Sequence, residues 1–284
     1  MNRIKVGHEN STPIELYYED HGTGRPVVLI HGWPLSGASW EKQVGVLLQA
    51  GYRVITYDRR GFGRSSQPGE GYDYDTFAKD LDEVLKKLDV HDCALVGFSM
   101  GGGEVARFLG TYGSKRVSQA VFISSITPHL LKSAATPTGV DGDVFARMCT
   151  EIIADRLAFL SAFFADFYNI DLLGGKVASQ HMVHYSWDIA ASASATATLA
   201  CVNAWLTDFR SDVAKIAVPT LILHGDADRI LPIDATAHPL LNLVPNAQLK
   251  VIAGGPHGMT WTHAEQVNAE LLSFLGQHAA VTAV

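Results

Sequence analysis

The sequence predicts an α/β fold, in which a mostly parallel central sheet is flanked by helices and interrupted by an inserted helical cap. Short, continuously apolar runs alternate with segments of helical period in the first third of the chain and after residue 215. Such runs are typical of strands buried on both faces. The alternation stops between about 129 and 214, a stretch too long for a normal connection. We therefore expect a core domain over 1–128 and 215–284 and a helical cap over 129–214.

Composition supports a large buried core and narrows the classes of partner. Of the 284 residues, 47% are hydrophobic and 18% are charged, which excludes a disordered chain. The net charge of −7 argues against a nucleic-acid partner, because nucleic-acid binding usually needs a basic surface.

Three features bear on the compartment. Cys93, Cys149 and Cys201 show neither zinc-site spacing nor a disulfide framework, which favours a reducing compartment. The first residues lack the apolar stretch of a signal peptide, and no run is long enough to cross a membrane. We expect a cytoplasmic protein with no membrane partner.

Eight strands are expected. The first two resemble an antiparallel hairpin, and the others are short buried runs of a parallel sheet. In chain order they are Arg3–Gly7, Ile14–Asp20, Pro26–Ile30, Arg53–Asp58, Cys93–Phe98, Gln119–Ser124, Pro219–His224 and Leu249–Ala253.

Helices are expected between these strands. One begins near Asp75, a plausible N-cap, because the apolar residues that follow it recur at helical spacing. A second is expected over Gly102–Leu109. The closing helix carries an apolar face made of Val267, Leu271, Phe274 and Leu275.

The most specific motif is Gly97-Phe98-Ser99-Met100-Gly101. It follows a strand and precedes a helix, which is the context of a nucleophile elbow. Side chains at positions 97 and 101 would collide in so sharp a turn, and glycine removes that collision. Ser99 is therefore the expected nucleophile, held at the carboxyl edge of its strand beside a helix N-terminus that favours a developing oxyanion.

A serine nucleophile needs a base and a group that orients the base. In this strand–turn–helix context the acid follows the serine in the chain, and the histidine follows the acid. His257 lies in a Gly/Pro-rich loop after the last strand, and we expect it to be the base. The acid is Asp226 or Asp228; Asp228 is favoured, because Asp226 directly follows Gly225 and suits a turn.

Other histidines fit the role of base less well. His31 comes too early in the chain, and His224 precedes a turn and is expected to be structural. His263 is expected on the last helix, facing solvent or the cap.

Two backbone N–H groups are expected to form the oxyanion hole. One belongs to Met100, directly after the nucleophile, and the other to Trp33, in the loop after the third strand. Pro34 fixes its own φ and restricts Trp33 to extended geometry. Trp33, Pro34, Phe98 and, from the cap, Trp205 are expected to line a small apolar substrate pocket.

The charged stretch Tyr57–Ser65 is expected to be a turn whose charges pair locally. A phosphate-binding role for its arginines is disfavoured. Gly61-Phe62-Gly63 is too short to be a dinucleotide fingerprint and lacks its context.

Five motifs, in order, resemble the α/β-hydrolase superfamily and, within it, the cofactor-free bacterial haloperoxidases. These enzymes are also called non-haem chloroperoxidases or perhydrolases, and they include aryl esterases and γ-lactamases. The motifs are His31–Ser36, Tyr57–Ser65, Gly97–Gly103, His224–Arg229 and Gly254–Gly258.

The resemblance implies a Ser99, Asp228 and His257 triad with no metal, no haem and no other cofactor. It implies an acyl-enzyme formed from a small-molecule acyl substrate (an ester, carboxylic acid or lactam), which water releases as acid and hydrogen peroxide as peracid. Proline after the oxyanion-hole tryptophan, here Pro34, is associated in this family with perhydrolysis. Homo-oligomers are common in the family.

Two other functions stay open. A C–C bond hydrolase on the same fold would keep the same triad. A non-catalytic small-ligand receptor on a hydrolase scaffold would not turn over esters. Dehalogenases and epoxide hydrolases are disfavoured, because they would need an aspartate at position 99.

Overall fold

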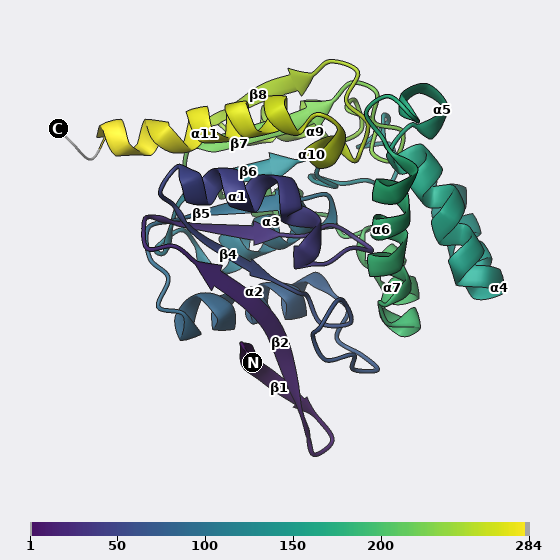
Figure 1. The fold of residues 1–284 in the computed structure, drawn as a ribbon, viewed down its shortest axis with the longest axis horizontal. Coiled ribbons are helices and arrows are strands. Elements are labelled where there is room, and N and C mark those ends of the chain that lie inside the picture. Colours follow the sequence, from purple (N-terminus) through teal and green to yellow (C-terminus); the bar gives the residue numbers. More distant parts are fainter. Residues whose placement is uncertain (1, 282–284) are drawn as a thin grey trace.

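The computed structural model describes residues 2–281. A twisted sheet forms the centre of the molecule (Figure 1). The spatial order of the strands in this sheet is β1-β2-β4-β3-β5-β6-β7-β8. In chain order the strands are β1 (Arg3–Glu9), β2 (Thr12–His21), β3 (Pro26–Ile30), β4 (Arg53–Tyr57), β5 (Cys93–Phe98), β6 (Val117–Ile123), β7 (Thr220–Gly225) and β8 (Ala247–Ile252). β3 and β5 have the expected bounds, and those of the other strands differ from the expected ones by one or two residues.

The pairing confirms a mostly parallel sheet. β1 runs antiparallel to β2, and β2 runs antiparallel to β4. Every other neighbouring pair is parallel, so the carboxyl ends of β3 to β8 lie at one edge of the sheet. Ligands in open α/β sheets bind at that edge.

Helices cover both faces of the sheet. α1 (Glu41–Gln49) and α11 (Ala264–Val281) lie on one face (Figure 1). The other face is covered by α2 (Tyr74–Lys87), α3 (Met100–Tyr112), α8 (Arg210–Val213) and α9 (Ala237–Leu243). Two short elements, η1 (Gly37–Trp40) and α10 (Met259–Thr262), complete this part of the chain.

The N-terminus of α2 corrects one expectation. Asp73, and not Asp75, is the N-cap: its carboxylate accepts a hydrogen bond from the Thr76 backbone N–H at 2.9 Å. Asp75 lies within the first helical turn. Both positions suit an acidic residue, because the N-terminal N–H groups of a helix lack intrahelical partners.

Between β6 and β7 the chain forms a group of helices at the carboxyl edge of the sheet (Figure 1). The group comprises α4 (Gly142–Phe167), α5 (Ile170–Leu173), α6 (Gln180–Ala191) and α7 (Ala195–Ala204). α4 bends at Asp155 (φ −157°, ψ 93°), whose carboxylate accepts hydrogen bonds from the backbone N–H groups of Leu157 and Ala158 and so starts a second helical segment. No helix within residues 2–281 combines the length and apolar character needed to span a membrane.

Candidate active site

Ser99 occupies a strained turn between β5 and α3. Its φ of 54° and ψ of −117° lie outside the regions that side chains favour. A Cβ built on Gly97 would lie 2.5 Å from the carbonyl oxygen of Gly101, so the flanking glycines are needed for the chain to turn here. The turn places the Ser99 hydroxyl at the carboxyl edge of the sheet.

A hydrogen-bonded chain joins the ends of three strands. The Ser99 hydroxyl lies 2.9 Å from Nε2 of His257, and Nδ1 of His257 lies 2.8 Å from Oδ2 of Asp228. The other oxygen of Asp228 accepts the backbone N–H groups of Ile230 and Leu231 at 3.0 and 2.8 Å. All of these groups are shielded from water except Ile230, which is partly exposed.

The charge state of Asp228 suits an orienting role. Burial raises the pKa of this carboxyl, but the adjacent His257 and the backbone N–H of Leu231 outweigh burial, and the pKa lies below its usual value. Asp228 therefore remains a carboxylate, whose Oδ2 accepts a hydrogen bond from the Nδ1–H group of His257. That bond leaves Nε2 free of a proton and able to accept one from Ser99.

The structure separates the two candidate acids. The carboxylate of Asp226 accepts the backbone N–H of Gly254 at 2.6 Å and so holds a turn. His224, behind Asp228, places Nε2 2.8 Å from the carbonyl of Leu231. His263 lies between α10 and α11 instead of on the last helix, and it is partly buried.

The loop after β3 packs closely against Phe98 and Ser99. A Cβ added to Gly32 would lie 2.8 Å from the Phe98 ring and 3.0 Å from the Cβ of Ser99. This contact brings the backbone of Trp33 next to the turn that carries Met100. The Trp33–Pro34 peptide bond is cis.

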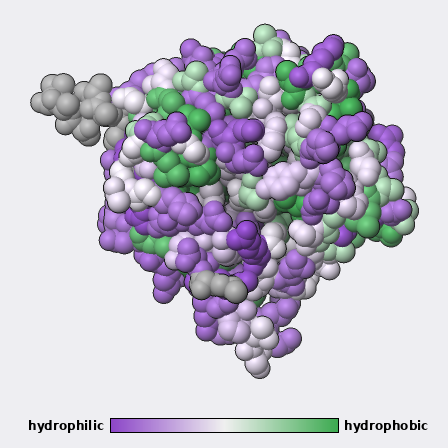
Figure 2. All heavy atoms as spheres, viewed as in Figure 1, coloured by the Kyte–Doolittle hydropathy of each residue, from purple (hydrophilic) through white to green (hydrophobic). Residues whose placement is uncertain are grey.

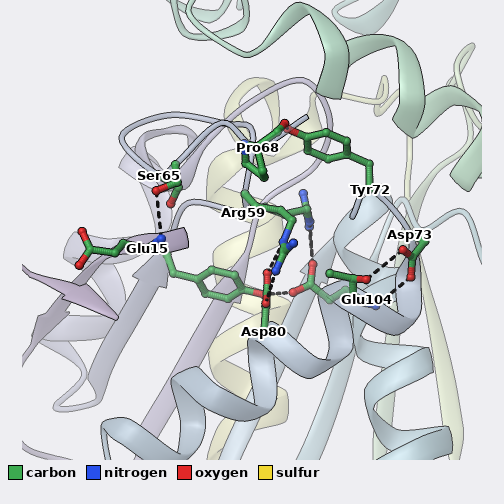
Figure 3. A network of polar contacts seen from close by, with 12 residues as sticks. Glu15, Arg59, Ser65, Pro68, Tyr72, Asp73, Asp80 and Glu104 are labelled. Atoms are coloured by element: carbon green, nitrogen blue, oxygen red, sulfur yellow. Dashed lines mark hydrogen bonds and ion pairs between the residues drawn. The ribbon is translucent and has the colours of Figure 1, made fainter. Parts of the chain in front are cut away.

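A buried polar network holds this loop in place. Figure 3 shows Arg59 and Glu104, two of its members. The backbone N–H of Arg59 donates to Nε2 of His31 at 2.9 Å, and its guanidinium donates to the His31 carbonyl at 3.0 Å. The same guanidinium donates to Glu104 on α3 at 2.7 Å, and the Tyr57 hydroxyl also donates to Glu104. Arg59 thereby connects the loop before Trp33 to the helix that follows Ser99.

This network corrects the expectation that the charges of Tyr57–Ser65 pair locally. Arg59 pairs with Glu104, and Arg60 pairs with Asp80 of α2 at 2.7 Å, so both partners come from other elements. The physical reason is burial: Arg59 and Glu104 are 1% and 0% exposed, and an ion in that setting needs an opposite charge.

Protonation of buried histidines is expected to destabilise the fold. Burial lowers the pKa of His31 well below its usual 6.5, and burial also lowers that of His224. The folded state then binds fewer protons than the unfolded state, so stability is present above about pH 6.5 and is lost as the pH falls below it.

We expect the free energy of unfolding to fall by up to about 1.4 kcal/mol per pH unit for each of these histidines. Urea unfolding at about pH 7.5 and about pH 5.5 measures the change. A His181→Gln variant, altered at an exposed histidine, should lose the same amount. Equal stability at the two pH values would contradict the buried, neutral state of His31 and His224.

An apolar cavity of about 50 Å³ opens onto Ser99. Trp33 and Trp205 line it, as expected, together with Phe163 of α4. A larger cavity, of about 760 Å³, lies among α4, α5 and α6, but none of the hydrogen-bonded triad lines it. Of these two cavities, the smaller one is therefore the one in contact with the hydrogen-bonded triad.

Phe98 and Pro34 lie elsewhere than expected. Neither is among the residues that line the cavity. The Phe98 ring packs behind His257, with ring centroids 5.1 Å apart, and also against Trp40 and Phe167. Phe98 directly precedes Ser99, but its side chain points away from the Ser99 hydroxyl, because successive side chains of a strand point to opposite faces of the sheet.

Sequence reasoning missed an aromatic stripe on α4. Phe159 and Phe163 pack edge-on against Trp33, with centroids 6.3 and 5.1 Å apart, and Phe167 packs against His257 at 4.9 Å. These phenylalanines recur every four residues, so one helix face contacts both Trp33 and His257. That spacing was visible in the sequence.

Comparisons with known proteins show the family of this chain. The family model described as the alpha/beta hydrolase fold matches residues 25–264. A non-heme chloroperoxidase of Kitasatospora aureofaciens is 41% identical over 93% of this chain and 97% of its own length. A Synechocystis relative, whose name assigns it provisionally to the same class, is 58% identical over 97% of this chain and 100% of its own length.

Two further similar proteins carry the names of other activities. A bifunctional esterase/perhydrolase of Acinetobacter calcoaceticus is 36% identical over 92% of this chain and 96% of its own length. The crystal structure of a bromoperoxidase from Bacillus anthracis superposes with a TM-score of 0.92 at 50% identity, covering 96% of this chain and 99% of that one.

Proposed function

Because this chain belongs to the α/β-hydrolase family, we propose that it is a serine hydrolase that forms an acyl-enzyme from small esters, carboxylic acids or lactams. Hydrogen peroxide as well as water then accepts the acyl group. The observation that carries the proposal is the hydrogen-bonded chain from Asp228 through His257 to Ser99.

In the first half-reaction Ser99 attacks the substrate carbonyl while Nε2 of His257 takes the hydroxyl proton. Asp228 holds the imidazole and stabilises its positive charge. The N–H groups of Trp33 and Met100 bind the oxyanion, each contributing roughly 3–4 kcal/mol to the lower barrier. His257 then gives the proton to the leaving group, and Ser99 keeps the acyl group as an ester.

In the second half-reaction His257 takes a proton from water or hydrogen peroxide, which attacks the acyl carbon. Ser99 leaves with a proton from His257, and the product is an acid or a peracid. Every step uses side chains and backbone groups of this chain alone. The apolar cavity at Ser99 and the names of the esterase and perhydrolase relatives support this reaction over C–C bond hydrolysis or ligand reception.

The proposal extends to domain organisation and partners. Residues 129–214 act as a cap on a core made of 1–128 and 215–284, because residues of α4 and α7 cover the oxyanion loop. We place the enzyme in the cytoplasm, with small molecules as partners and neither nucleic acid nor membrane among them.

The enzyme is also proposed to be a homo-oligomer. Ile153, Leu157, Leu172 and Val177, all in the cap, are between 43% and 71% exposed. Figure 2 shows hydrophobic residues on the side of the molecule where α4 and α5 lie. Apolar side chains gathered on a surface favour contact with a second copy.

Turnover of p-nitrophenyl acetate, measured with and without hydrogen peroxide, tests the proposed reaction. Nitrophenol release is expected in both conditions, and peracetic acid is expected only with peroxide. Absence of any turnover across a panel of esters, amides and lactams would refute the hydrolase.

Replacing Pro34 with leucine is expected to lower the ratio of perhydrolysis to hydrolysis while ester hydrolysis continues. The physical reason is that Pro34 fixes the carbonyl of Trp33, which we propose accepts a hydrogen bond from peroxide. Peracid and acid formed from one ester give the ratio. Pro34→Ala separates loss of the ring from added bulk, and an unchanged ratio in Pro34→Leu would rule out this role.

A further inference from the structure

The cavity at Ser99 contains one thioether sulfur, that of Met148, which α4 contributes. The rest of the lining is aliphatic and aromatic apart from the Ser99 hydroxyl and the indole N–H groups of Trp33 and Trp205. A thioether sulfur is polarisable and is oxidised to a sulfoxide by peroxy compounds. Met148 is thus a nucleophilic sulfur in the space where the peracid of the proposed reaction is released.

Met148 differs in its setting from the other methionines of residues 2–281. Met100, Met182 and Met259 are buried, at 0%, 3% and 0% exposure, and none of them lines this cavity. Met148 is partly exposed. Burial therefore protects the other three sulfurs, whereas the cavity exposes Met148 to its contents.

We infer that Met148 is a site of oxidation by the enzyme's own peracid product, an inference that rests on the proposed perhydrolase function. The sulfur lone pair attacks the terminal peroxy oxygen of the peracid. The O–O bond breaks, an S–O bond forms, and the acid leaves with the peracid proton. The sulfur is oxidised by two electrons, the peracid is reduced to the carboxylic acid, and the atoms balance.

Geometry favours this reaction inside the cavity over oxidation from bulk solution. With a volume of about 50 Å³, the cavity leaves a bound small peracid in contact with its walls. The reacting groups are held together, which raises their effective concentration. Hydrogen peroxide alone reacts more slowly, because it is a weaker electrophile than a peracid.

Oxidation changes the character of the cavity. A sulfoxide is bulkier and more polar than a thioether, so oxidation brings a polar group into a cavity whose lining is mostly apolar. We expect the modified enzyme to bind apolar acyl groups less well. Activity should therefore decline during turnover with peroxide and persist during turnover with water, and reduction of the sulfoxide should restore it.

Peptide mass spectrometry tests this inference on a Val251→Met variant. Position 251 lies on β8, is 48% exposed, and belongs neither to the cavity nor to the cap residues proposed to contact a second copy, so the new sulfur reports peracid in bulk solution. The variant is incubated with methyl acetate and hydrogen peroxide, in the presence of excess free methionine as a scavenger, and peracetic acid is measured in a parallel sample without scavenger. One added oxygen is expected at Met148, and little at position 251.

Controls separate the possible outcomes. Peroxide without ester, and Ser99→Ala with both reagents, should leave Met148 reduced. Met148→Leu should keep a larger share of its own initial rate during turnover with peroxide. Equal oxidation at positions 148 and 251 would overturn the inference, and so would peracid formation with Met148 left reduced, while the proposed function stands in both cases. Absence of peracid would refute the perhydrolase function and this inference together.

Discussion

Replacing Ser99 with alanine is expected to lower kcat for p-nitrophenyl acetate by on the order of 10⁴-fold or more, because the acyl-enzyme can no longer form. The His257 imidazole and the backbone N–H groups remain, so substrate binding should persist. Steady-state kinetics together with ligand binding by the variant separate the two effects. Turnover close to that of the parent would exclude Ser99 as the nucleophile.

A glycine at position 99 gives a matched control. Alanine keeps the strain of the positive φ at this position, whereas glycine removes it. We expect Ser99→Gly to be as inactive as Ser99→Ala and at least as stable as the parent in urea unfolding. A strained residue whose removal costs no stability is typical of a functional position.

Replacing Glu104 with glutamine is expected to lower the free energy of unfolding by about 3–5 kcal/mol. The variant keeps the shape of the side chain but leaves the Arg59 guanidinium buried without an opposite charge. One guanidinium nitrogen, Nη1, already lacks a hydrogen-bond partner among the residues that the structure describes. The Arg59 guanidinium therefore has no spare hydrogen bond that could replace its charged partner. Urea unfolding measures the change.

Asp75→Asn is the control for that measurement. Asp75 also pairs with an arginine, Arg107, but its side chain is 79% exposed. An exposed pair contributes less than about 1 kcal/mol, so this variant should unfold close to the parent. Equal losses in the two variants would mean that burial does not determine the contribution of the Glu104 pair.

Much of the core could be predicted because its signals are local. Buried strands such as Pro26–Ile30 are continuous apolar runs, and the turn at Ser99 needs glycine at positions 97 and 101 for a steric reason. The order of serine, acid and histidine along the chain then points to His257 and to Asp226 or Asp228, of which Asp228 is favoured because Asp226 directly follows Gly225. The structure brings Ser99, Asp228 and His257 together within hydrogen-bonding distance.

Contacts between distant segments could not be predicted in this way. The Arg59 partner Glu104 lies on another element, and a charged stretch in the sequence does not indicate which charges are buried. The direction of the Phe98 ring depends on which sheet face it occupies. Phe159, Phe163 and Phe167 show helical spacing, but only the packing of α4 on the core shows that they contact Trp33 and His257.

The central claim is that one acyl-enzyme, formed on Ser99, reacts with either water or hydrogen peroxide. The most direct test measures the ratio of peracetic acid to acetic acid, at one fixed peroxide concentration, for acetate esters with different leaving groups. A common intermediate has lost the leaving group before peroxide reacts, so the account predicts the same ratio for methyl, phenyl and p-nitrophenyl acetate. A ratio that changes with the leaving group would contradict it.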